Sequence, residues 1–173
     1  MTLLAIDPGN IESAYILIHD DYSIVQAGKV RNEDLLWIVK DGWYDRIAIE
    51  MVACYGMPVG KEVFDTCVWI GRFTEAATVK VDYVYRQEEK LLLCNSVRAK
   101  DTNIRQALID RFAKFDFKNG KGTKKNPDYF YGFKADMWAA MAIACVWMEK
   151  ESEKYENRNP KRGRPSYRGG DPC

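Results

Sequence analysis

Two short apolar runs carry an acidic residue at or beside their end, and this feature constrains the fold more than any other. Residues 2–7 are Thr-Leu-Leu-Ala-Ile-Asp followed by Pro-Gly, and residues 46–51 are Arg-Ile-Ala-Ile-Glu-Met. A short apolar run bounded by turn residues is typical of a buried β-strand. If the two strands are parallel neighbours, Asp7 and Glu50 emerge at one edge of the sheet, roughly 5 Å apart. The carboxyl edge is where α/β sheets place their ligand sites.

Turn residues and hydrophobic periodicity complete an α/β pattern along the chain. Three further strands are expected, at residues 13–19, 23–29 and 79–85. Four helices are expected: a short one after Asn32, a long one at 59–77, one from Lys100 to about Phe115 and a last one at 135–150. The order β-β-β-α-β-α-β-α-α predicts an α/β fold, a mixed five-stranded sheet flanked by helices on both faces.

The composition indicates one domain followed by a tail. The chain has 173 residues, of which 47% are hydrophobic, and this is enough for one packed core. We expect a domain at 1–153 and a basic tail at 154–173, disordered where Asn, Pro, Gly and Arg dominate without apolar periodicity. Residues 157–173 carry a net charge of +4, against −3 for the rest of the chain. The tail arginines suit either non-specific affinity for an anionic partner or solubility.

The remaining composition excludes several functional classes. The five cysteines are widely spaced and lack a Cys-x-x-Cys pair, so neither a disulfide framework nor a zinc ribbon is expected. A single histidine, His19, excludes catalysis that needs several histidines. No apolar run reaches the ~18–20 residues of a membrane span, and Asp7 would interrupt a signal peptide. We therefore expect a cytoplasmic protein without membrane association.

A third acidic residue, Asp136, stands in the first turn of the apolar last helix. If that helix begins at the same sheet edge, Asp136 joins Asp7 and Glu50. Three clustered carboxylates keep their charge only with cations between them, and oxygen ligands of this kind select Mg²⁺ or Mn²⁺. Two such ions roughly 3.5–4 Å apart can activate water and stabilise the leaving oxygen in phosphodiester hydrolysis.

Each of these acids also has a plain structural interpretation. Asp7 is followed by Pro-Gly and can be a turn former, and Asp136 can be an acid that the helix dipole favours. Glu50 is the hardest to explain structurally, because an acid in an apolar strand is rarely buried without a partner.

Five stretches of the sequence together resemble one nuclease family. They are Leu-Leu-Ala-Ile-Asp-Pro-Gly-Asn-Ile-Glu-Ser at 3–13, Ala-Ile-Glu-Met at 48–51, Tyr-Gly-Met-Pro-Val-Gly-Lys-Glu-Val-Phe-Asp-Thr at 55–66 with Trp-Ile-Gly-Arg-Phe at 69–73, Lys-Asp-Thr-Asn-Ile-Arg-Gln-Ala-Leu at 100–108, and Lys-Ala-Asp-Met-Trp-Ala-Ala-Met-Ala-Ile-Ala at 134–144. In this order the chain resembles the RuvC-type Holliday junction resolvases of the RNase H-like superfamily, in particular the branch carried by bacteriophages. The resemblance covers nearly the whole chain up to about residue 150.

The resemblance implies a homodimeric, metal-dependent endonuclease that cleaves branched DNA in the cytoplasm of a bacterial host cell. It implies that Asp7, Glu50 and Asp136 are catalytic and hold Mg²⁺, with Mn²⁺ as an alternative. The family usually has a further acid or histidine three residues before the last aspartate, where this chain has Phe133. Asp128, in the preceding loop, is the candidate to replace that ligand.

An acidic site that acts on phosphodiesters needs cations around it to hold DNA. The candidates are lysines of the glycine-containing loop at 118–128 and basic residues near the expected site edge. They are Lys118, Lys121, Lys124, Lys125, Lys61, Arg72, Arg98, Lys100, Arg105 and Lys134. Gly120 and Gly122 would let the loop approach a phosphate closely. The resemblance suggests that Lys100 and the helix after it face DNA, and a solvated mobile loop is the alternative for the loop lysines.

Aromatic and apolar residues suggest two further features of a junction nuclease. Tyr55 and Met57, in the loop after the fourth strand, could wedge into unstacked base steps. The helix at 59–77 could form a two-fold dimer whose two sites face two strands of a junction. Its contact residues would be Phe64, Trp69 and Phe73, with Gly71 permitting close approach. A packed loop and a buried core helix are the structural alternatives.

Three alternative functions share parts of these features. An RNase H-like nuclease without junction preference would use the same carboxylates. A non-catalytic branched-DNA-binding module would keep the DNA surface without the metals, although the three acids argue against it. An actin-like nucleotide-binding domain also follows its first strand with an Asp-x-Gly loop, but it needs a second lobe and roughly twice this length.

Overall fold

The computed structural model describes residues 1–54, 56 and 58–158. Tyr55, Met57 and residues 159–173, which include most of the basic tail, lie outside the described residues. The suggestion that Tyr55 and Met57 probe a junction therefore stays a prediction, as does the disorder expected for the end of the chain.

Five strands form one mixed sheet, as the sequence predicts. They are β1 (Thr2–Asp7), β2 (Glu12–His19), β3 (Ile24–Arg31), β4 (Arg46–Met51) and β5 (Val81–Tyr85). Their order is β3-β2-β1-β4-β5, with the β1–β4 and β4–β5 pairs parallel and the other two antiparallel. Ile6 pairs with Ile49, so the next residues, Asp7 and Glu50, lie at the same carboxyl edge.

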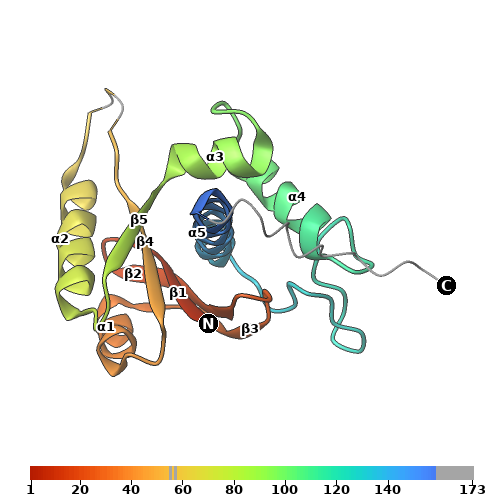
Figure 1. Cartoon of the computed structure of the whole chain (residues 1–173), viewed down its shortest axis with the longest axis horizontal. Helices are drawn as coiled ribbons and strands as arrows, with labels where there is room; N and C mark the ends of the chain where they lie inside the picture. The colour runs from red at the N-terminus through yellow and green to blue at the C-terminus, as the bar shows by residue number, and fades with distance from the viewer. Residues whose placement is uncertain (55, 57, 159–173) are drawn as a thin grey trace.

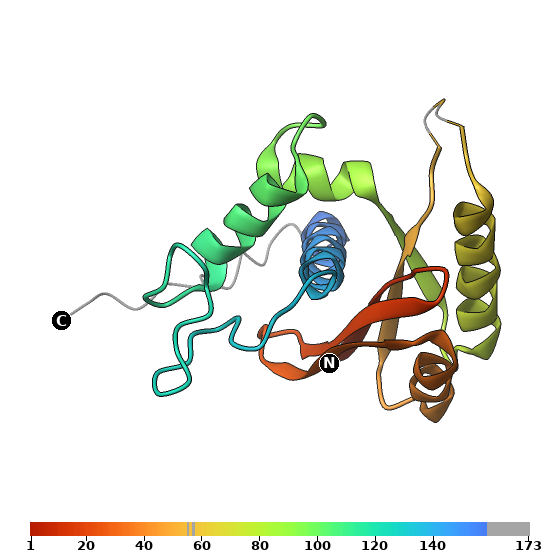
Figure 2. The ribbon, with the colours of Figure 1, turned by 180° about the vertical axis from the view of Figure 1, so that it is seen from behind.

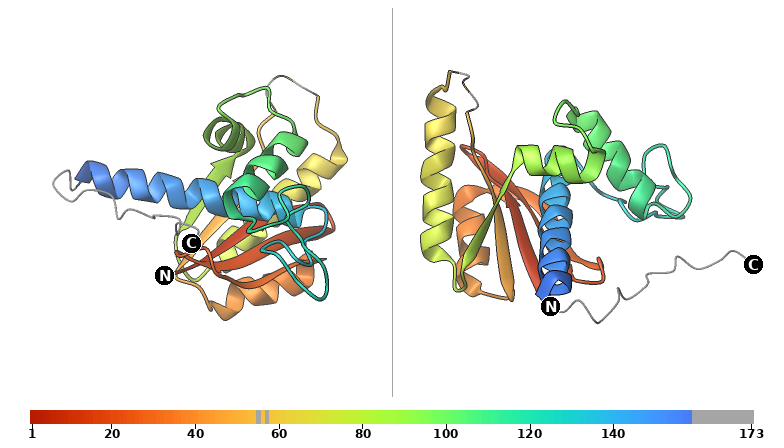
Figure 3. Two further views of the ribbon diagram at one scale, coloured as in Figure 1. Left: turned by 90° about the vertical axis from the view of Figure 1, so that its right-hand side faces the viewer. Right: turned by 45° about the horizontal axis from the view of Figure 1, so that its top comes forward.

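Helices cover both faces of this sheet (Figure 1). Those in the described part of the chain are α1 (Asn32–Asp41), α2 (Lys61–Ala76), α3 (Arg86–Cys94), α4 (Asp101–Phe112) and α5 (Met137–Arg158). Helices α1 and α2 cover one face, and α5 packs across the other with α3 and α4 around it (Figures 1 and 2). Figure 3 shows that the last turns of α5 extend beyond the sheet. The predicted α/β class, a mixed five-stranded sheet flanked by helices, is therefore confirmed.

Alternating side chains of β1 divide the core into two halves. Leu3 and Ala5 face α5, whereas Leu4 and Ile6 face α1 and α2, and all four are fully buried. Burial on both faces is expected for a central strand with helices on either side. Helix α5 adds the buried residues Met137 and Trp138 and a continuous buried segment at 140–148, and this packing fixes the start of α5 over the sheet.

Helix α3 is not predicted by the sequence pattern. Its apolar residues, Leu91, Leu92 and Leu93, are consecutive and lack the period of an amphipathic helix. A capping box stabilises its start, since the Glu88 side chain accepts a hydrogen bond of 2.7 Å from the Tyr85 N–H. Packing against α4 and α5 then stabilises a helix whose sequence signal is weak.

Two other helices end elsewhere than expected. Helix α4 stops at Phe112 and leaves Phe115 outside, because Ala113 adopts an extended backbone. Helix α5 continues to Arg158, so residues 154–158 of the expected tail are helical. None of the helices among the described residues combines the length and apolarity that a membrane crossing requires.

Candidate active site

Asp7 and Glu50 meet at the carboxyl edge of the central parallel strands. Asp7 ends β1, and Glu50 is the second-last residue of β4. The two carboxyl groups are close enough for a hydrogen bond between them to contribute to the raised pKa of Asp7. Burial, reinforced by the negative charge of Glu50, raises the pKa of Asp7 from its ordinary value of 3.8 to about 9. Without a cation, this pair therefore retains a proton at neutral pH.

Asp136, directly before α5, adds a third carboxylate. Its negative charge also raises the pKa of Asp7, although less than burial and Glu50 do, so the two side chains are close enough to interact. One oxygen of Asp136 lies 2.6 Å from Nζ of Lys29 on β3, and the same ammonium lies 4.0 Å from Glu12. The sequence does not reveal Lys29, because an exposed lysine on an edge strand carries no local sign of a partner so far along the chain.

Glu89 of α3 is a fourth carboxylate at this edge, and it is fully buried. Arg86, one helical turn earlier, binds one oxygen of Glu89, and its other terminal nitrogen binds Asp101 at the start of α4. Burial, and after it the charge of Glu50, raises the pKa of Glu89 to about 8. Sequence reasoning missed Glu89 because a Glu-Glu pair in a polar segment is typical of a solvated helix face.

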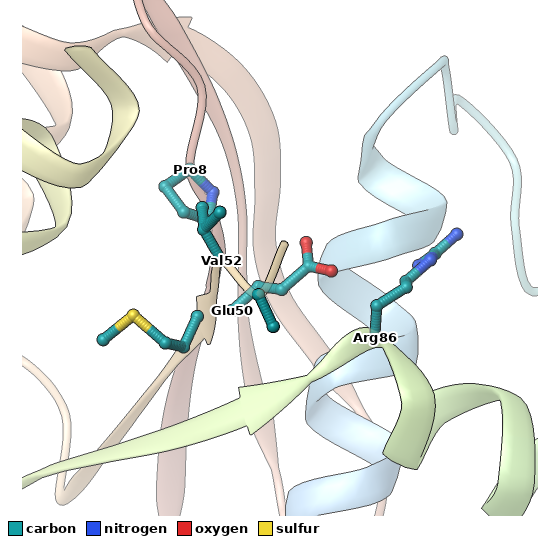
Figure 4. Close-up of a pocket in the computed structure, with 6 residues that line it drawn as sticks. Pro8, Glu50, Val52 and Arg86 are labelled. Atoms are coloured by element: carbon teal, nitrogen blue, oxygen red, sulfur yellow. The ribbon is translucent and has the colours of Figure 1, made fainter. Parts of the chain in front are cut away.

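A cavity of about 220 Å³ opens beside Glu50 (Figure 4). It is lined by Pro8, Glu50, Met51, Val52, Ala53 and Arg86. Figure 4 shows the Glu50 side chain rising from β4 and the Arg86 side chain from the start of α3, directly after β5. The lining thus includes an acid that can bind a cation and a guanidinium that can bind a phosphate.

The donor set fits a hard divalent cation, although the side chains do not surround one as they stand. All four acids offer oxygen ligands, the kind that Mg²⁺ and Mn²⁺ prefer, and a cation would relieve the mutual repulsion that adds to the raised pKa of Asp7. Within the described part of the chain, no three Asp, Glu, His or Cys side chains are arranged so that they could hold an ion. Asp136 faces Lys29, and Glu89 faces Arg86. Metal binding therefore requires the acids to rearrange around the cation.

Neither Phe133 nor Asp128 supplies a further ligand. Phe133 is buried with its ring packed edge-on against Phe130 and Trp138. The Asp128 carboxylate accepts hydrogen bonds from four backbone N–H groups, those of Lys114, Phe115, Asp116 and Tyr129. Burial opposes the ionisation of Asp128, but these backbone bonds prevail and lower its pKa. The suggestion that Asp128 replaces a metal ligand is wrong, because its carboxylate is committed to shaping the loop before α5.

Asp128 and Asp116 together hold the lysine-rich loop 118–128. Asp116 accepts hydrogen bonds of 3.0–3.2 Å from three backbone N–H groups of the loop, those of Asn119, Lys121 and Gly122. The loop is thus anchored by hydrogen bonds at the end of α4, which disfavours the alternative of a freely mobile loop. Its lysines remain accessible: Lys118, Lys124 and Lys125 are exposed, and Lys121 is half-buried.

The two glycines of this loop serve its own folding. Gly120 and Gly122 have φ angles of 72° and 62°, in the left-handed region. A Cβ on Gly120 would lie 2.8 Å from the Phe130 ring, and one on Gly122 would lie 2.4 Å from the carbonyl oxygen of Asn126. These positions pack against the protein itself, so the expectation that they bring the backbone to a phosphate is not supported.

Two basic residues at and within the start of α4 adjoin residues that border the site. Lys100 directly precedes Asp101, which is bound to Arg86 beside the site. The guanidinium of Arg105 lies 4.6 Å from the centre of the Trp138 ring, in the first turn of α5. Lys134 and Arg98 are exposed in the segments that precede α5 and α4.

The two basic residues of α2 lie at different distances from the site edge. Lys61 begins α2 after the loop that leaves β4. The helix then runs back toward the start of β5, so Arg72, eleven residues later, lies roughly 16 Å further along. Its guanidinium lies 3.9 Å from the centre of the Trp69 ring. The role of Arg72 in DNA binding stays a prediction.

The strand order and the helices on both faces define an RNase H-like α/β fold, and solved structures place it among RuvC-like folds. Thermus thermophilus RuvC is similar with a TM-score of 0.60 and 14% sequence identity, over 88% of this chain and 97% of that one. The structure of T. thermophilus RuvC with a Holliday junction substrate gives 0.62 at 12% identity, over 88% and 96%. A fowlpox virus resolvase in complex with its substrate Holliday junction DNA gives 0.54 at 13% identity, over 87% and 99%. The sequence matches no protein-family model and no curated protein, so these likenesses establish the fold.

Proposed function

We propose that this protein is a divalent-metal-dependent endonuclease that cleaves phosphodiesters in Holliday junctions and other branched DNA. The observation that carries the proposal is the convergence of Asp7, Glu50 and Asp136 at one sheet edge. The likeness of the fold to resolvases solved with junction DNA supports the choice of substrate. The resemblance to the branch carried by bacteriophages adds the expectation that the protein acts in the cytoplasm of a bacterial host cell.

Asp7, Glu50 and Asp136 are the residues that would hold Mg²⁺, with Mn²⁺ as the alternative. A divalent cation at this position supplies the charge that activates water and stabilises the leaving oxygen of a phosphodiester. Asp7 and Glu50 must give up the proton that the pair retains, because only the ionised carboxylates are good ligands. Lys29 orients Asp136 from the neighbouring edge strand.

The DNA surface that we propose surrounds this carboxylate edge. It comprises the loop before α5, the start of α4 and the start of α2. Its residues are Lys118, Lys121, Lys124, Lys125, Lys134, Lys100, Arg105 and Lys61. Cations on these segments would hold the phosphates on either side of the scissile bond, and so offset the repulsion between DNA and the acidic centre.

The homodimer that we propose uses α2, with Phe64 and Gly71 as expected but with Val68 in place of Phe73. Phe73 is fully buried in the core and cannot contact a partner. Phe64 and Val68 are each 61% exposed, and a Cβ on Gly71 would meet open space. Their i, i+4, i+7 spacing puts Phe64, Val68 and Gly71 on one face of α2. An exposed apolar stripe of this kind suits a symmetric contact with the same helix of a second copy.

A cleavage assay tests the proposed activity. The protein with Mg²⁺ is expected to cut a synthetic four-way junction and a Y-fork and to leave a linear duplex intact. Asp7→Asn is expected to abolish cleavage and to keep junction affinity within about two-fold, because it removes a metal ligand outside the phosphate-binding surface. The matched control is Asp34→Asn, an exposed acid on α1 that should remain active.

The same assay distinguishes the alternatives. Equal cleavage of an RNA–DNA hybrid would favour an RNase H-like nuclease without junction preference. Tight junction binding without cleavage in any divalent metal would favour a non-catalytic DNA-binding module. Full activity of Asp7→Asn would reject the proposed site.

A further inference from the structure

Glu89 is a buried carboxylate with one oxygen that has no partner. Its residue is 0% exposed, and Oε1 is the one buried side-chain nitrogen or oxygen, among the described residues, that lacks a hydrogen-bond partner. A carboxyl oxygen left in the interior without a hydrogen-bond partner is unfavourable. Such an atom in a folded protein therefore calls for a missing ligand.

The neighbours of Glu89 show which site that oxygen belongs to. The charge of Glu50 acts on Glu89, and the charge of Glu89 acts on Asp7, so the three carboxylates lie within electrostatic reach of one another. Arg86, which binds Glu89, also lines the cavity beside Glu50. Glu89 therefore borders the carboxylate centre from α3. The sequence analysis does not name it among the acids of this centre.

Other contacts hold the Glu89 side chain in place. Arg86 occupies Oε2 of Glu89 and leaves Oε1 unbound. The same guanidinium reaches Asp101 and so links α3 to α4. Lys150 of α5 lies 2.6 Å from Glu88, the residue before Glu89, and links α3 to α5. The carboxylate is thus positioned by three helices with one oxygen left for a ligand.

The charge balance of the centre points to a cation as that ligand. Lys29 and Arg86 are the cationic side chains paired with acids of the cluster, and they face four carboxylates. When all four are ionised, an excess of negative charge remains that a divalent cation would balance, in place of the proton that the metal-free centre retains. Position 133, three residues before Asp136, is a buried phenylalanine, so the segment that leads into α5 offers no second acid there.

We propose that Glu89 is a fourth metal ligand of this centre, supplying Oε1 to a divalent cation held by Asp7 and Glu50, with Arg86 as its positioning residue. This inference rests on the proposed function, because it concerns the same metal. It assigns a carboxylate from the helix after β5 to a site otherwise built from β1, β4 and the start of α5.

Metal binding by the full chain tests the proposal without relying on activity. Titration calorimetry with Mn²⁺, together with the electron paramagnetic resonance signal of free Mn²⁺, measures affinity and stoichiometry. Glu89→Gln is expected to weaken Mn²⁺ binding at least ten-fold or to remove one bound ion. The control is Glu149→Gln, which alters a half-buried glutamate that is also paired with an arginine, Arg111, away from the site. This control should bind Mn²⁺ within two-fold of wild type.

A second variant and the melting temperature keep the result interpretable. Glu89→Asp keeps the charge but shortens the side chain, and it should also weaken Mn²⁺ binding. In metal-free buffer, Glu89→Gln should melt no lower than the control, because it replaces a buried unsatisfied carboxylate by a neutral amide. Wild-type Mn²⁺ affinity in Glu89→Gln would overturn the proposal and leave Glu89 as a counter-ion of Arg86. If the wild-type protein bound no Mn²⁺, the proposed function itself would fail. If Asp7→Asn lost Mn²⁺ binding while Glu89→Gln kept it, only the role of Glu89 would be rejected.

Discussion

Asp7 is the residue whose chemistry depends most on its surroundings. Burial and neighbouring carboxylates raise its pKa to about 9, so the metal-free protein keeps a proton there at neutral pH. A cation must displace that proton to bind, and its affinity should therefore rise with pH. Glu89, with a pKa of about 8, adds to the same trend.

The raised pKa of Asp7 predicts that the metal-free protein loses stability as pH rises. The folded-state pKa lies above the unfolded value near 3.8, so this group stabilises the fold fully below about pH 4 and ceases to do so as pH approaches 9. In EDTA, the free energy of unfolding of wild type relative to Asp7→Asn should fall by up to about 1.4 kcal/mol for each pH unit between about pH 5 and pH 8. Urea unfolding at several pH values measures this difference, and parallel curves for the two proteins would contradict a protonated Asp7.

Among the elements, the loop before α5 has a backbone held by two aspartates and exposes positively charged side chains to solvent. Asp116 and Asp128 accept backbone hydrogen bonds that fold the loop, while Lys124 and Lys125 stay exposed at its tip. If the loop binds DNA as proposed, these aspartates would contribute indirectly, through the conformation of the loop rather than through metal ligation.

Removing the two tip lysines should weaken junction binding in a salt-dependent way. For Lys124→Ala combined with Lys125→Ala, we expect about ten-fold lower affinity for the junction. The slope of log affinity against log salt concentration should be smaller by about 1–2, because binding releases fewer counterions when phosphate contacts are lost. The control, Lys40→Ala combined with Lys80→Ala, removes the same charge from α1 and from the start of β5. Fluorescence anisotropy over a salt series measures both quantities, and equal effects of the two double variants would show that the loop makes no specific contribution.

At the scale of the whole molecule, α2 lies on the face of the sheet opposite α5 (Figures 1 and 2). Its exposed stripe of Phe64, Val68 and Gly71 therefore faces away from the core half that carries α3 and α4. A dimer through this stripe would leave both carboxylate centres open, as a nuclease that cuts two strands of a junction requires.

A charge placed on this stripe should separate the dimer. Val68→Glu is expected to give a monomer at micromolar concentration with nearly unchanged melting temperature, because Val68 is 61% exposed and contributes little to the core. Val25→Glu is the matched control, since Val25 is 52% exposed on β3, away from α2. Sedimentation or light scattering reports the mass; a monomeric wild type, or a dimeric Val68→Glu, would contradict the α2 interface.

The sequence by itself determined the α/β class, the mixed sheet and the arrival of Asp7 and Glu50 at one edge. These features follow from local rules: apolar runs form strands, turn residues end them, and parallel neighbours finish on the same side. The presence of Asp136 near that edge could be predicted for a similar reason, because it stands at the start of a strongly apolar helix. Their roles as metal ligands remain predictions.

Tertiary structure alone decided which polar groups are buried and which charges face one another. Glu89 looks like a surface acid in the sequence and is buried only because α3 docks on α4 and α5. Lys29 and Asp136 form an ion pair although 107 residues separate them. Phe73 is buried rather than available to a partner, because the rotation of α2 depends on its packing against the sheet. Burial and long-range electrostatics depend on segments distant along the chain, so no local pattern of residues encodes them.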